Sequence, residues 1–171
     1  MMERMGEVTF QGKPVTLIGP ALKVGDKAPD FTVIDNNLQP LKLTDFKGKV
    51  LVLVAVPSLD TSVCDIEARR FNAEAPKLGD GVVVLVVSMD LPFAQKRWCG
   101  ANGIERVITA SDHREASFGS AYGVLVKELR LLARAIFVID RKGVIRYFQL
   151  VKEAGQEPDY QSALDAVRSL K

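Results

Sequence analysis

Val50-Leu-Val-Leu-Val-Ala-Val56, followed by Pro57-Ser-Leu-Asp-Thr-Ser-Val-Cys64, is the stretch that decides the fold. Its first part is an unbroken apolar run, which predicts a strand buried on both faces of a mainly parallel sheet. Pro57 ends this strand, because it has no N–H for the ladder and a fixed φ. Thr61 carries a hydroxyl that can cap a helix, so we expect a helix to begin there with Cys64 in its first turn.

The helix predicted over Val63–Leu78 has one apolar face that we expect to pack on the sheet. A cysteine in the first turn of a helix lies at the positive end of the helix dipole, beside unpaired N–H groups that stabilise a thiolate. Cys64 is therefore a candidate reactive thiol, and the alternative interpretation is a small buried apolar residue. The predicted apolar face consists of Val63, Ile66, Phe71, Ala75 and Leu78.

Length and composition limit the class of protein. The 171 residues, 47% of them hydrophobic, suffice for a single domain over residues 1–171 but not for two domains. The formal net charge is +2 with acids and bases interspersed, which argues against binding to nucleic acid or to an anionic membrane. The longest apolar runs have the length of strands, far below the roughly 20 residues of a membrane-spanning helix.

The start of the chain and its cysteines indicate the compartment. Residues 1–6 include Glu3 and Arg4 and lack the apolar run of a secretory peptide, so we expect a cytoplasmic protein. The two cysteines, Cys64 and Cys99, are too few for a secreted fold held together by disulfides. They suit a catalytic redox pair in a reducing compartment.

An N-terminal extension over residues 1–19 is predicted to form a β-hairpin. Its apolar stretches Val8–Phe10 and Val15–Ile18 are joined by a turn that contains Gly and Pro. Two further strands, Phe31–Ile34 and Leu41–Leu43, flank a pair of asparagines, which is a second turn signal because Asn tolerates positive φ. These pieces precede the first buried strand.

Strands and helices then alternate, which predicts βαβ crossovers and a parallel core. The chain ends differently, with two strands joined by Asp140-Arg-Lys-Gly143 as an antiparallel hairpin, and a last helix. These elements predict an α/β fold of the thioredoxin-like type, a three-layer sandwich with a mixed central sheet and helices on both faces. After the helix that carries Cys64, they are the strand Val82–Ser88, the helix Pro92–Cys99, the strand Val107–Ile108, the helix Arg114–Ser120, the strands Leu132–Ile139 and Val144–Val151, and the helix Tyr160–Leu170.

Three separated motifs carry a resemblance to a known family. Pro57-Ser-Leu-Asp-Thr-Ser-Val-Cys64 has the Pro-x-x-x-Thr-x-x-Cys pattern of the peroxiredoxins, at the strand-to-helix junction where that family carries it. Met89-Asp-Leu-Pro-Phe-Ala-Gln-Lys-Arg-Trp-Cys99 and Leu131-Leu-Ala-Arg134-Ala follow in the same order. With all three, the chain resembles the thiol peroxidases, the atypical two-cysteine branch of the peroxiredoxins, over nearly its whole length.

The resemblance implies an enzyme that reduces hydrogen peroxide and organic hydroperoxides. It implies that the Cys64 thiolate attacks the peroxide to give a sulfenic acid. It also implies that Cys99 of the same chain resolves the sulfenic acid to a disulfide, and that thioredoxin reduces this disulfide. A homodimer is the oligomeric state that the resemblance implies.

The residue types support this chemistry on their own terms. Attack on an O–O bond needs a donor for the attacked oxygen, and positive charge where the leaving oxygen becomes anionic. Thr61 can place its hydroxyl between sulfur and peroxide, and Pro57 would form a wall of the pocket and shield the sulfur. Arg134 interrupts an apolar run, where a guanidinium needs a task or a partner. The alternative interpretation of Arg134 is a salt bridge at the end of a strand.

Cys99 is predicted to end a helix and to enter a flexible turn, since Gly100, Asn102 and Gly103 follow it. An inert, half-buried thiol would fit that place equally well, and the family resemblance favours the resolving role. The Cα atoms of a disulfide lie within about 4.4–6.8 Å of each other. Two helical cysteines packed on one sheet are seldom that close, so we expect local unwinding during turnover.

Other kinds of site find no support in the sequence. The single histidine, His113, and two distant cysteines do not make a zinc site, so we expect no metal ion. No GxGxxG, GxxxxGK or GxSxG motif occurs, so we expect neither a nucleotide cofactor nor serine hydrolase chemistry.

Two alternative functions stay open. One is a thiol-disulfide oxidoreductase on the same fold, although the Cys-x-x-Cys motif typical of that chemistry is lacking. The other is a non-enzymatic redox sensor that passes an oxidised cysteine to a partner protein. A sensor needs the same reactive thiolate as a peroxidase, so only continuous consumption of peroxide separates the two.

Overall fold

The structure is a computed structural model that describes residues 2–170. Met1 and Lys171, the ends of the predicted domain 1–171, lie outside the described residues, as does the first residue of the predicted extension 1–19. Within residues 2–170, no helix is long and apolar enough to cross a membrane. The elements are β1 (Glu3–Phe10), β2 (Lys13–Ile18), β3 (Thr32–Asp35), β4 (Pro40–Lys42), the 3-10 helix η1 (Leu43–Phe46), β5 (Val50–Ala55), α1 (Ser62–Leu78), β6 (Val82–Ser88), α2 (Pro92–Asn102), β7 (Ile108–Ser111), α3 (Ser117–Ala121), β8 (Leu125–Val126), β9 (Leu131–Leu132), β10 (Ala135–Ile139), β11 (Ile145–Leu150) and α4 (Tyr160–Arg168).

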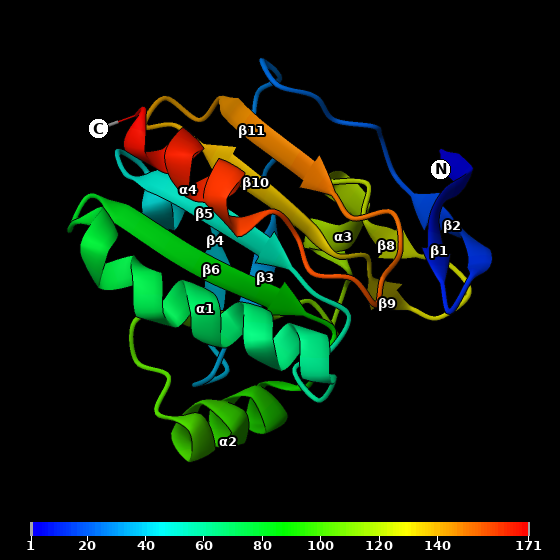
Figure 1. Cartoon of the computed structure of the whole chain (residues 1–171), viewed down its shortest axis with the longest axis horizontal. Helices are drawn as coiled ribbons and strands as arrows, with labels where there is room; N and C mark the ends of the chain where they lie inside the picture. Colours follow the sequence, from blue (N-terminus) through cyan, green and yellow to red (C-terminus); the bar gives the residue numbers. More distant parts are fainter. Residues whose placement is uncertain (1, 171) are drawn as a thin grey trace.

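A seven-stranded sheet in the order β11-β10-β5-β6-β7-β3-β4 forms the middle of the molecule (Figure 1). β5, β6 and β7 pair in parallel, and the other neighbours pair antiparallel, including the predicted hairpin of β10 and β11. Every residue of β5 is buried, because alternate side chains enter two separate cores. Val52 and Val54 enter one core, and Leu51 and Leu53 enter the other.

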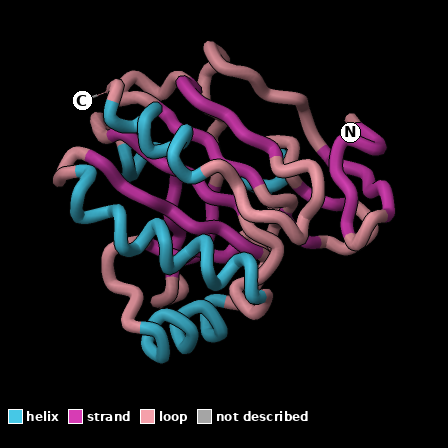
Figure 2. The backbone as a smooth tube through the Cα atoms, in the orientation of Figure 1, coloured by secondary structure: helices cyan, strands magenta, loops and turns pink. Residues whose placement is uncertain are grey.

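Two layers cover the faces of this sheet. α1, α2 and α4 lie on one face, the helical layer that Figure 2 shows in cyan, where Phe71, Trp98 and Leu164 pack against the valines of β5. α3 and a second sheet, of four strands in the order β1-β2-β8-β9, contribute Leu17 and Phe118 to the core on the other face. The structure therefore confirms the predicted three-layer α/β sandwich with a mixed central sheet and an N-terminal hairpin.

The N-terminal hairpin lies within the predicted extension, its strands are longer than the apolar stretches that predicted them, and it is half of the second sheet. β1 and β2 pair antiparallel around Gln11 and Gly12, which have positive φ angles of 52° and 78°, as in a two-residue hairpin turn. β2 pairs on its other side with β8, and Val8 and Leu17 are buried. The hairpin thus contributes to the core on this face of the central sheet.

The predicted strand Leu132–Ile139 is wrong in one respect, because it is broken into β9 and β10 with Ala133 and Arg134 between them. β9 pairs with β8 in the second sheet, whereas β10 pairs with β5 in the central sheet. The chain must leave one sheet and enter the other at this point. Arg134 therefore lies at the junction of the two sheets and not inside a strand.

The predicted helix Arg114–Ser120 and strand Val107–Ile108 have other bounds, since the observed elements are α3, Ser117–Ala121, and β7, Ile108–Ser111. α3 begins later than predicted because the buried carboxylate of Asp112 accepts the first free N–H groups of the helix, at 3.0 and 2.7 Å. Burial raises the pKa of Asp112 to about 6, against the opposing effect of these hydrogen bonds.

The predicted helix Pro92–Cys99 continues to Asn102 as α2 and ends at Gly103, which has a left-handed φ of 63°. The prediction that Cys99 ends a helix is therefore wrong. Cys99 lies inside the last turns of α2, and its carbonyl oxygen accepts a hydrogen bond from the N–H of Ile104 at 3.0 Å. Unwinding at Cys99 would therefore break helical hydrogen bonds on both sides of the residue.

Candidate active site

Cys64 lies in the first turn of α1, with its side chain fully buried. Thr61 is the N-cap residue: its backbone is extended, and its Oγ1 accepts a hydrogen bond from the Cys64 N–H at 3.3 Å. β5 ends at Ala55, and the buried Pro57 follows before the chain turns into the helix. The predicted position of Cys64 at a helix start behind a buried strand is thus confirmed.

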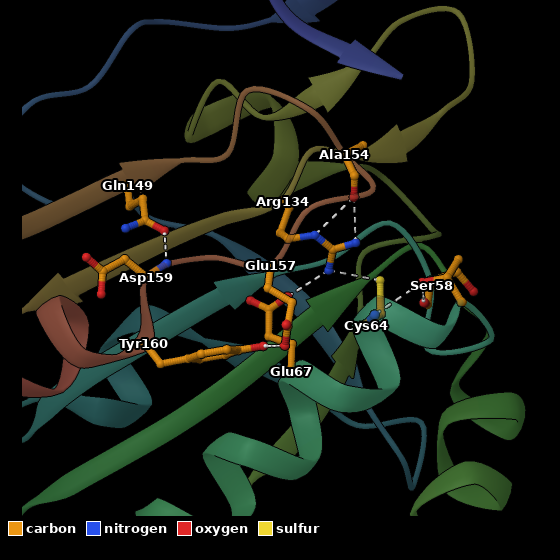
Figure 3. A network of polar contacts seen from close by, with 10 residues as sticks. Ser58, Cys64, Glu67, Arg134, Gln149, Ala154, Glu157, Asp159 and Tyr160 are labelled. Atoms are coloured by element: carbon orange, nitrogen blue, oxygen red, sulfur yellow. Dashed lines mark hydrogen bonds and ion pairs between the residues drawn. The ribbon is translucent and has the colours of Figure 1, made fainter. Parts of the chain in front are cut away.

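Arg134 reaches Cys64 from the junction of the two sheets (Figure 3). Its side chain is almost fully buried, and its Nη1 donates to Cys64 Sγ at 3.2 Å. The other nitrogens, Nε and Nη2, both donate to the carbonyl oxygen of Ala154, at 3.1 and 2.8 Å. A buried guanidinium needs such partners on every side, and here one of them is a sulfur.

Glu67 is a site residue that the sequence analysis missed. Its Oε2 accepts a hydrogen bond from Arg134 Nη1 at 2.7 Å, and both side chains are buried. The predicted apolar face of α1 is wrong at Ile66, which is 50% exposed, whereas Cys64 and Glu67 are buried. The missed signal was spacing, because residues three apart share one face of a helix and Glu67 stands three residues after Cys64.

Burial and charge oppose each other within this group. Burial raises the pKa of Glu67 to about 7, although the nearby charge of Arg134 and its hydrogen bond lower it. For Arg134 itself burial lowers the pKa, but the charges of Cys64 and Glu67 outweigh burial and raise it. Arg134 therefore stays a cation, and its Nη1 is shared between Cys64 and Glu67. Glu67 Oε1 has no hydrogen-bond partner among residues 2–170.

A pocket of about 320 Å³ lies beside Cys64, which is itself buried behind the residues that line the pocket. Pro57, Thr61 and Arg134 form part of its lining, so three of the five residues predicted for the site meet at one cavity, with Cys64 in contact with two of them. The remaining lining comes from the end of β1, the first turn of α1 and the loop after β11. These residues are Phe10, Gln11, Ser62, Val63, Glu153, Ala154 and Gly155.

Cys99, the fifth predicted residue, lies elsewhere. It is half-buried on α2, and its Sγ is 3.3 Å from the Oγ1 of Thr109 on β7. Thr109 Oγ1 also donates to Asn36 Oδ1 at 3.1 Å, and Asn36 Nδ2 is 4.0 Å from the sulfur. The contacts of Cys99 are thus with neutral side chains.

The two thiols have contacts with different parts of the central sheet. Cys64 contacts Arg134 at the start of β10, and Cys99 contacts Thr109 on β7. β10 and β7 are separated in the sheet by β5 and β6, so the two thiols have different contacts with the sheet. Both cysteines are free in this structure, and a bond between them would require α1 or α2 to move.

Two side chains connect the surroundings of the thiols. Trp98 Nε1 donates to Asp65 Oδ1 at 2.9 Å, which ties α2 to the first turn of α1. Asp90, just before α2, accepts the Ser58 hydroxyl at 2.6 Å and the Leu59 N–H at 2.8 Å. The loop between Pro57 and Cys64 is therefore held by the same segment that leads into the helix of Cys99.

Within the part of the chain that the structure describes, no three His, Cys, Asp or Glu side chains lie close enough to hold a metal ion. The arrangement at Cys64 joins a buried thiol, a cation, a hydroxyl and an open pocket. These groups can stabilise a thiolate and the negative charge that develops on an oxygen leaving it.

Comparison with known proteins gives one family. The Redoxin family model matches residues 23–164. A thiol peroxidase of Bacillus subtilis is 57% identical over 166 residues, which are 97% of this chain and 99% of that protein. A thiol peroxidase of Staphylococcus aureus is 50% identical, over 97% of this chain and 100% of that protein.

Solved structures agree with this result. The crystal structure of a peroxiredoxin-like protein from Aquifex aeolicus superposes with a TM-score of 0.91 at 46% identity, covering 98% of this chain and 99% of that chain. A thiol peroxidase from Chromobacterium violaceum superposes with a TM-score of 0.82 at 22% identity, covering 95% of each chain. The second likeness concerns the fold alone.

Proposed function

This chain belongs to the Redoxin family and is a thiol peroxidase, an enzyme that reduces peroxides through cysteine chemistry, and from this premise we propose that Cys64 attacks the peroxide. The 3.2 Å contact between Arg134 Nη1 and Cys64 Sγ carries the proposal. A guanidinium at that distance favours a thiolate over a thiol. The neutral contacts of Cys99 supply no comparable stabilisation.

The proposed first step forms one bond and breaks one. The thiolate sulfur bonds to the nearer peroxide oxygen while the O–O bond breaks, and the leaving oxygen takes the electron pair and a proton to depart as water or an alcohol. Cys64 is thereby oxidised to a sulfenic acid. Arg134 stabilises the negative charge on the leaving oxygen, and Pro57 shields the sulfur from bulk water.

Thr61 has a more specific task in this proposal. Its hydroxyl now donates to the carbonyl oxygen of Ser58 at 3.1 Å and accepts from the Cys64 N–H. A hydroxyl can rotate its single hydrogen, so it can exchange the Ser58 carbonyl for a peroxide oxygen without losing its capping bond. The bound peroxide would then lie between a donor and the nucleophile.

Hydrogen peroxide and organic hydroperoxides are the proposed substrates. The pocket of about 320 Å³ is larger than hydrogen peroxide needs, and Phe10 and Val63 give its lining apolar surface. An alkyl group could occupy this surface, and a local movement that exposes the buried sulfur would let the O–O group reach it.

We propose that Cys99 of the same chain resolves the sulfenic acid. Its sulfur attacks the Cys64 sulfur, the oxygen leaves as water, and a disulfide forms. Because each sulfur is free and contacts other side chains in this structure, this step requires local unwinding of α1 or α2. Gly100, within α2, makes that helix easier to unwind.

The remaining parts of the proposal concern the reductant, the oligomeric state, the location and the domain organisation of the enzyme. We propose thioredoxin as the reductant of the disulfide, a homodimer as the oligomeric state and the cytoplasm as the location. We also propose that residues 1–171 act as one domain, supported by the shared core of both sheets. The redox sensor and the thiol-disulfide oxidoreductase have no counterpart among the relatives described above.

A coupled assay tests the proposal as a whole. Thioredoxin, its reductase and NADPH should sustain continuous oxidation of NADPH with hydrogen peroxide and with cumene hydroperoxide. Replacing thioredoxin with glutaredoxin and glutathione is the matched control, which should give little turnover. Oxidation that stops after one equivalent of peroxide per chain would contradict the proposed recycling.

The proposed resolution has its own test. Stoichiometric peroxide should give an oxidised protein that runs as a monomer on a non-reducing denaturing gel, with a Cys64–Cys99 crosslink in its peptide map. Cys99→Ser should consume one equivalent of peroxide and then lose turnover with thioredoxin. A disulfide-linked dimer would instead indicate resolution between chains, and full turnover by Cys99→Ser would indicate a one-cysteine mechanism.

A further inference from the structure

We propose that Glu153 is a positioning residue for peroxide reduction, because it fixes the loop whose Ala154 carbonyl oxygen holds the Arg134 guanidinium beside Cys64. The inference rests on the proposed function, in which Arg134 assists Cys64. It is carried by a continuous chain of hydrogen bonds that runs from the turn of the N-terminal hairpin to the sulfur.

Glu153 binds the turn of the hairpin through both carboxylate oxygens. Oε1 accepts the N–H of Gln11 at 3.1 Å, and Oε2 accepts the N–H of Gly12 at 3.2 Å and the hydroxyl of Thr9. Successive N–H groups at positive φ form a concave site for an anion. The bond from Thr9 and those from the backbone hold the pKa of Glu153 below its ordinary value, so it is a carboxylate at neutral pH.

The backbone beside Glu153 is fixed to the same strand. The N–H of Thr9 donates to the carbonyl oxygen of Lys152 at 2.7 Å, and the N–H of Ala154 donates to the carbonyl oxygen of Thr9 at 3.0 Å. These bonds hold the peptide units on both sides of Glu153. The direction of the Ala154 carbonyl group therefore depends on the docking of the hairpin.

The Ala154 carbonyl oxygen in turn orients Arg134. Two nitrogens of the guanidinium donate to this one oxygen, at 3.1 and 2.8 Å, and the guanidinium is planar, so the oxygen determines where the third nitrogen points. That third nitrogen, Nη1, contacts Cys64 Sγ and Glu67 Oε2. A displaced Ala154 would turn Nη1 away from the sulfur without removing any catalytic residue.

Glu128 provides a matched control for Glu153. Its carboxylate also accepts backbone N–H bonds from the hairpin, but from Thr16 in the middle of β2, at 3.0 and 2.9 Å. Glu153→Ala and Glu128→Ala each remove one carboxylate that anchors the hairpin. Only Glu153→Ala removes the side-chain bonds that tie the loop of Ala154 to the turn of the hairpin, while the backbone bonds between this loop and Thr9 remain.

Two measurements on the full chain test the inference: the rate of a single turnover with hydrogen peroxide, and the pH dependence of Cys64 alkylation, followed by peptide mapping. We expect Glu153→Ala to slow the single turnover by about threefold to tenfold, which is the size of effect typical of residues that interact through a shared neighbour. We also expect the alkylation of Cys64 to shift to higher pH. Glu128→Ala should stay within about twofold of the wild type in rate. Equal effects of the two variants would overturn the inference.

A double-mutant cycle separates positioning from general destabilisation. If Glu153 acts through Arg134, Glu153→Ala should cause no further loss of rate in an Arg134→Ala background, and additive losses would overturn the inference. If circular dichroism shows that Glu153→Ala disturbs the fold, Thr9→Val, which keeps the carboxylate, takes its place in the same cycle. Failure of the proposed function is distinguishable, because Arg134→Ala alone would then leave the rate unchanged.

Discussion

Cys64 and Cys99 lie on neighbouring helices over the same face of the sheet, but their surroundings differ in every respect that matters for a thiol. Cys64 is fully buried, bonded to a cation, and capped by Thr61 in the first turn of a long helix. Cys99 is half-buried, bonded to a neutral hydroxyl, and lies near the end of a shorter helix. The surroundings of Cys64 stabilise a negative charge on its sulfur. The weaker contacts of Cys99 allow its side chain to leave its position more easily.

The largest effect is expected when the thiol of Cys64 is removed. Cys64→Ser should lower peroxide reduction to the rate without enzyme, because the polar partners of Cys99 within residues 2–170 are the neutral Thr109 and Asn36. Circular dichroism should show an unchanged fold, since serine has nearly the same volume as cysteine. Residual turnover clearly above the background, measured in the coupled assay, would mean that Cys99 can act as a nucleophile.

The next effect removes the cation and keeps the thiol. Arg134→Ala should slow the second-order reaction with hydrogen peroxide at least about tenfold, or about 1.4 kcal/mol, because it removes the positive charge that stabilises the thiolate and the leaving oxygen. Arg146→Ala on β11, which breaks an ion pair with Asp140 in the turn before that strand, is the matched control and should be nearly neutral. An unchanged rate in Arg134→Ala would reduce Arg134 to a structural partner of Glu67.

A smaller effect is expected when a contact that holds the Cys99 side chain is removed. Thr109→Val removes the hydroxyl 3.3 Å from its sulfur, and loss of one such bond should raise the alkylation rate of Cys99 by about fivefold, equivalent to about 1 kcal/mol. The alkylation rate of Cys64 in the same peptide map is the internal control and should not change. A parallel rise for both cysteines would indicate general loosening of the helical layer.

The smallest effect concerns stability. Burial raises the pKa of Glu67 from 4.5 to about 7, so the folded state holds this proton more tightly than the unfolded chain does. The resulting stabilisation is complete below about pH 4.5 and is lost as the pH rises to about 7. Across this range, urea unfolding should show that the stability of the wild type falls relative to Glu67→Gln by about 1–3 kcal/mol.

The exposed Glu115 supplies the control for that comparison, because Glu115→Gln should give a pH profile parallel to that of the wild type. Parallel profiles for the wild type and Glu67→Gln would contradict the assignment of the titration to Glu67.

The fold was predictable where one local signal sufficed. The apolar run of β5 and Pro57 behind it located the central strand and the helix of Cys64, and alternation located the parallel core. The break at Arg134 was not predictable, because the residues from Leu131 to Ile139 are uniformly apolar apart from the arginine. Only pairing with two different sheets decides where that run divides.

The site shows the same division. The places of Thr61 and Pro57 near Cys64 were predictable, because the three residues lie in one short segment of the chain. Ala154 contributes a backbone oxygen, which no residue type signals, and its approach to Arg134 depends on the docking of the hairpin. The different partners of the two thiols, Arg134 for Cys64 and Thr109 for Cys99, likewise depend on the tertiary fold, which local patterns do not fix.

Trp98 is the one tryptophan of the chain, and its indole hydrogen bond to Asp65 spans the gap between the two cysteine helices. The indole is 9% exposed while both helices are intact. Unwinding that brings Cys99 toward Cys64 would have to break this bond and bring the ring into water, where tryptophan emission shifts to longer wavelength. The molecule thus contains a built-in optical probe beside its second thiol, and fluorescence can follow the opening and closing of α2 in real time without any label.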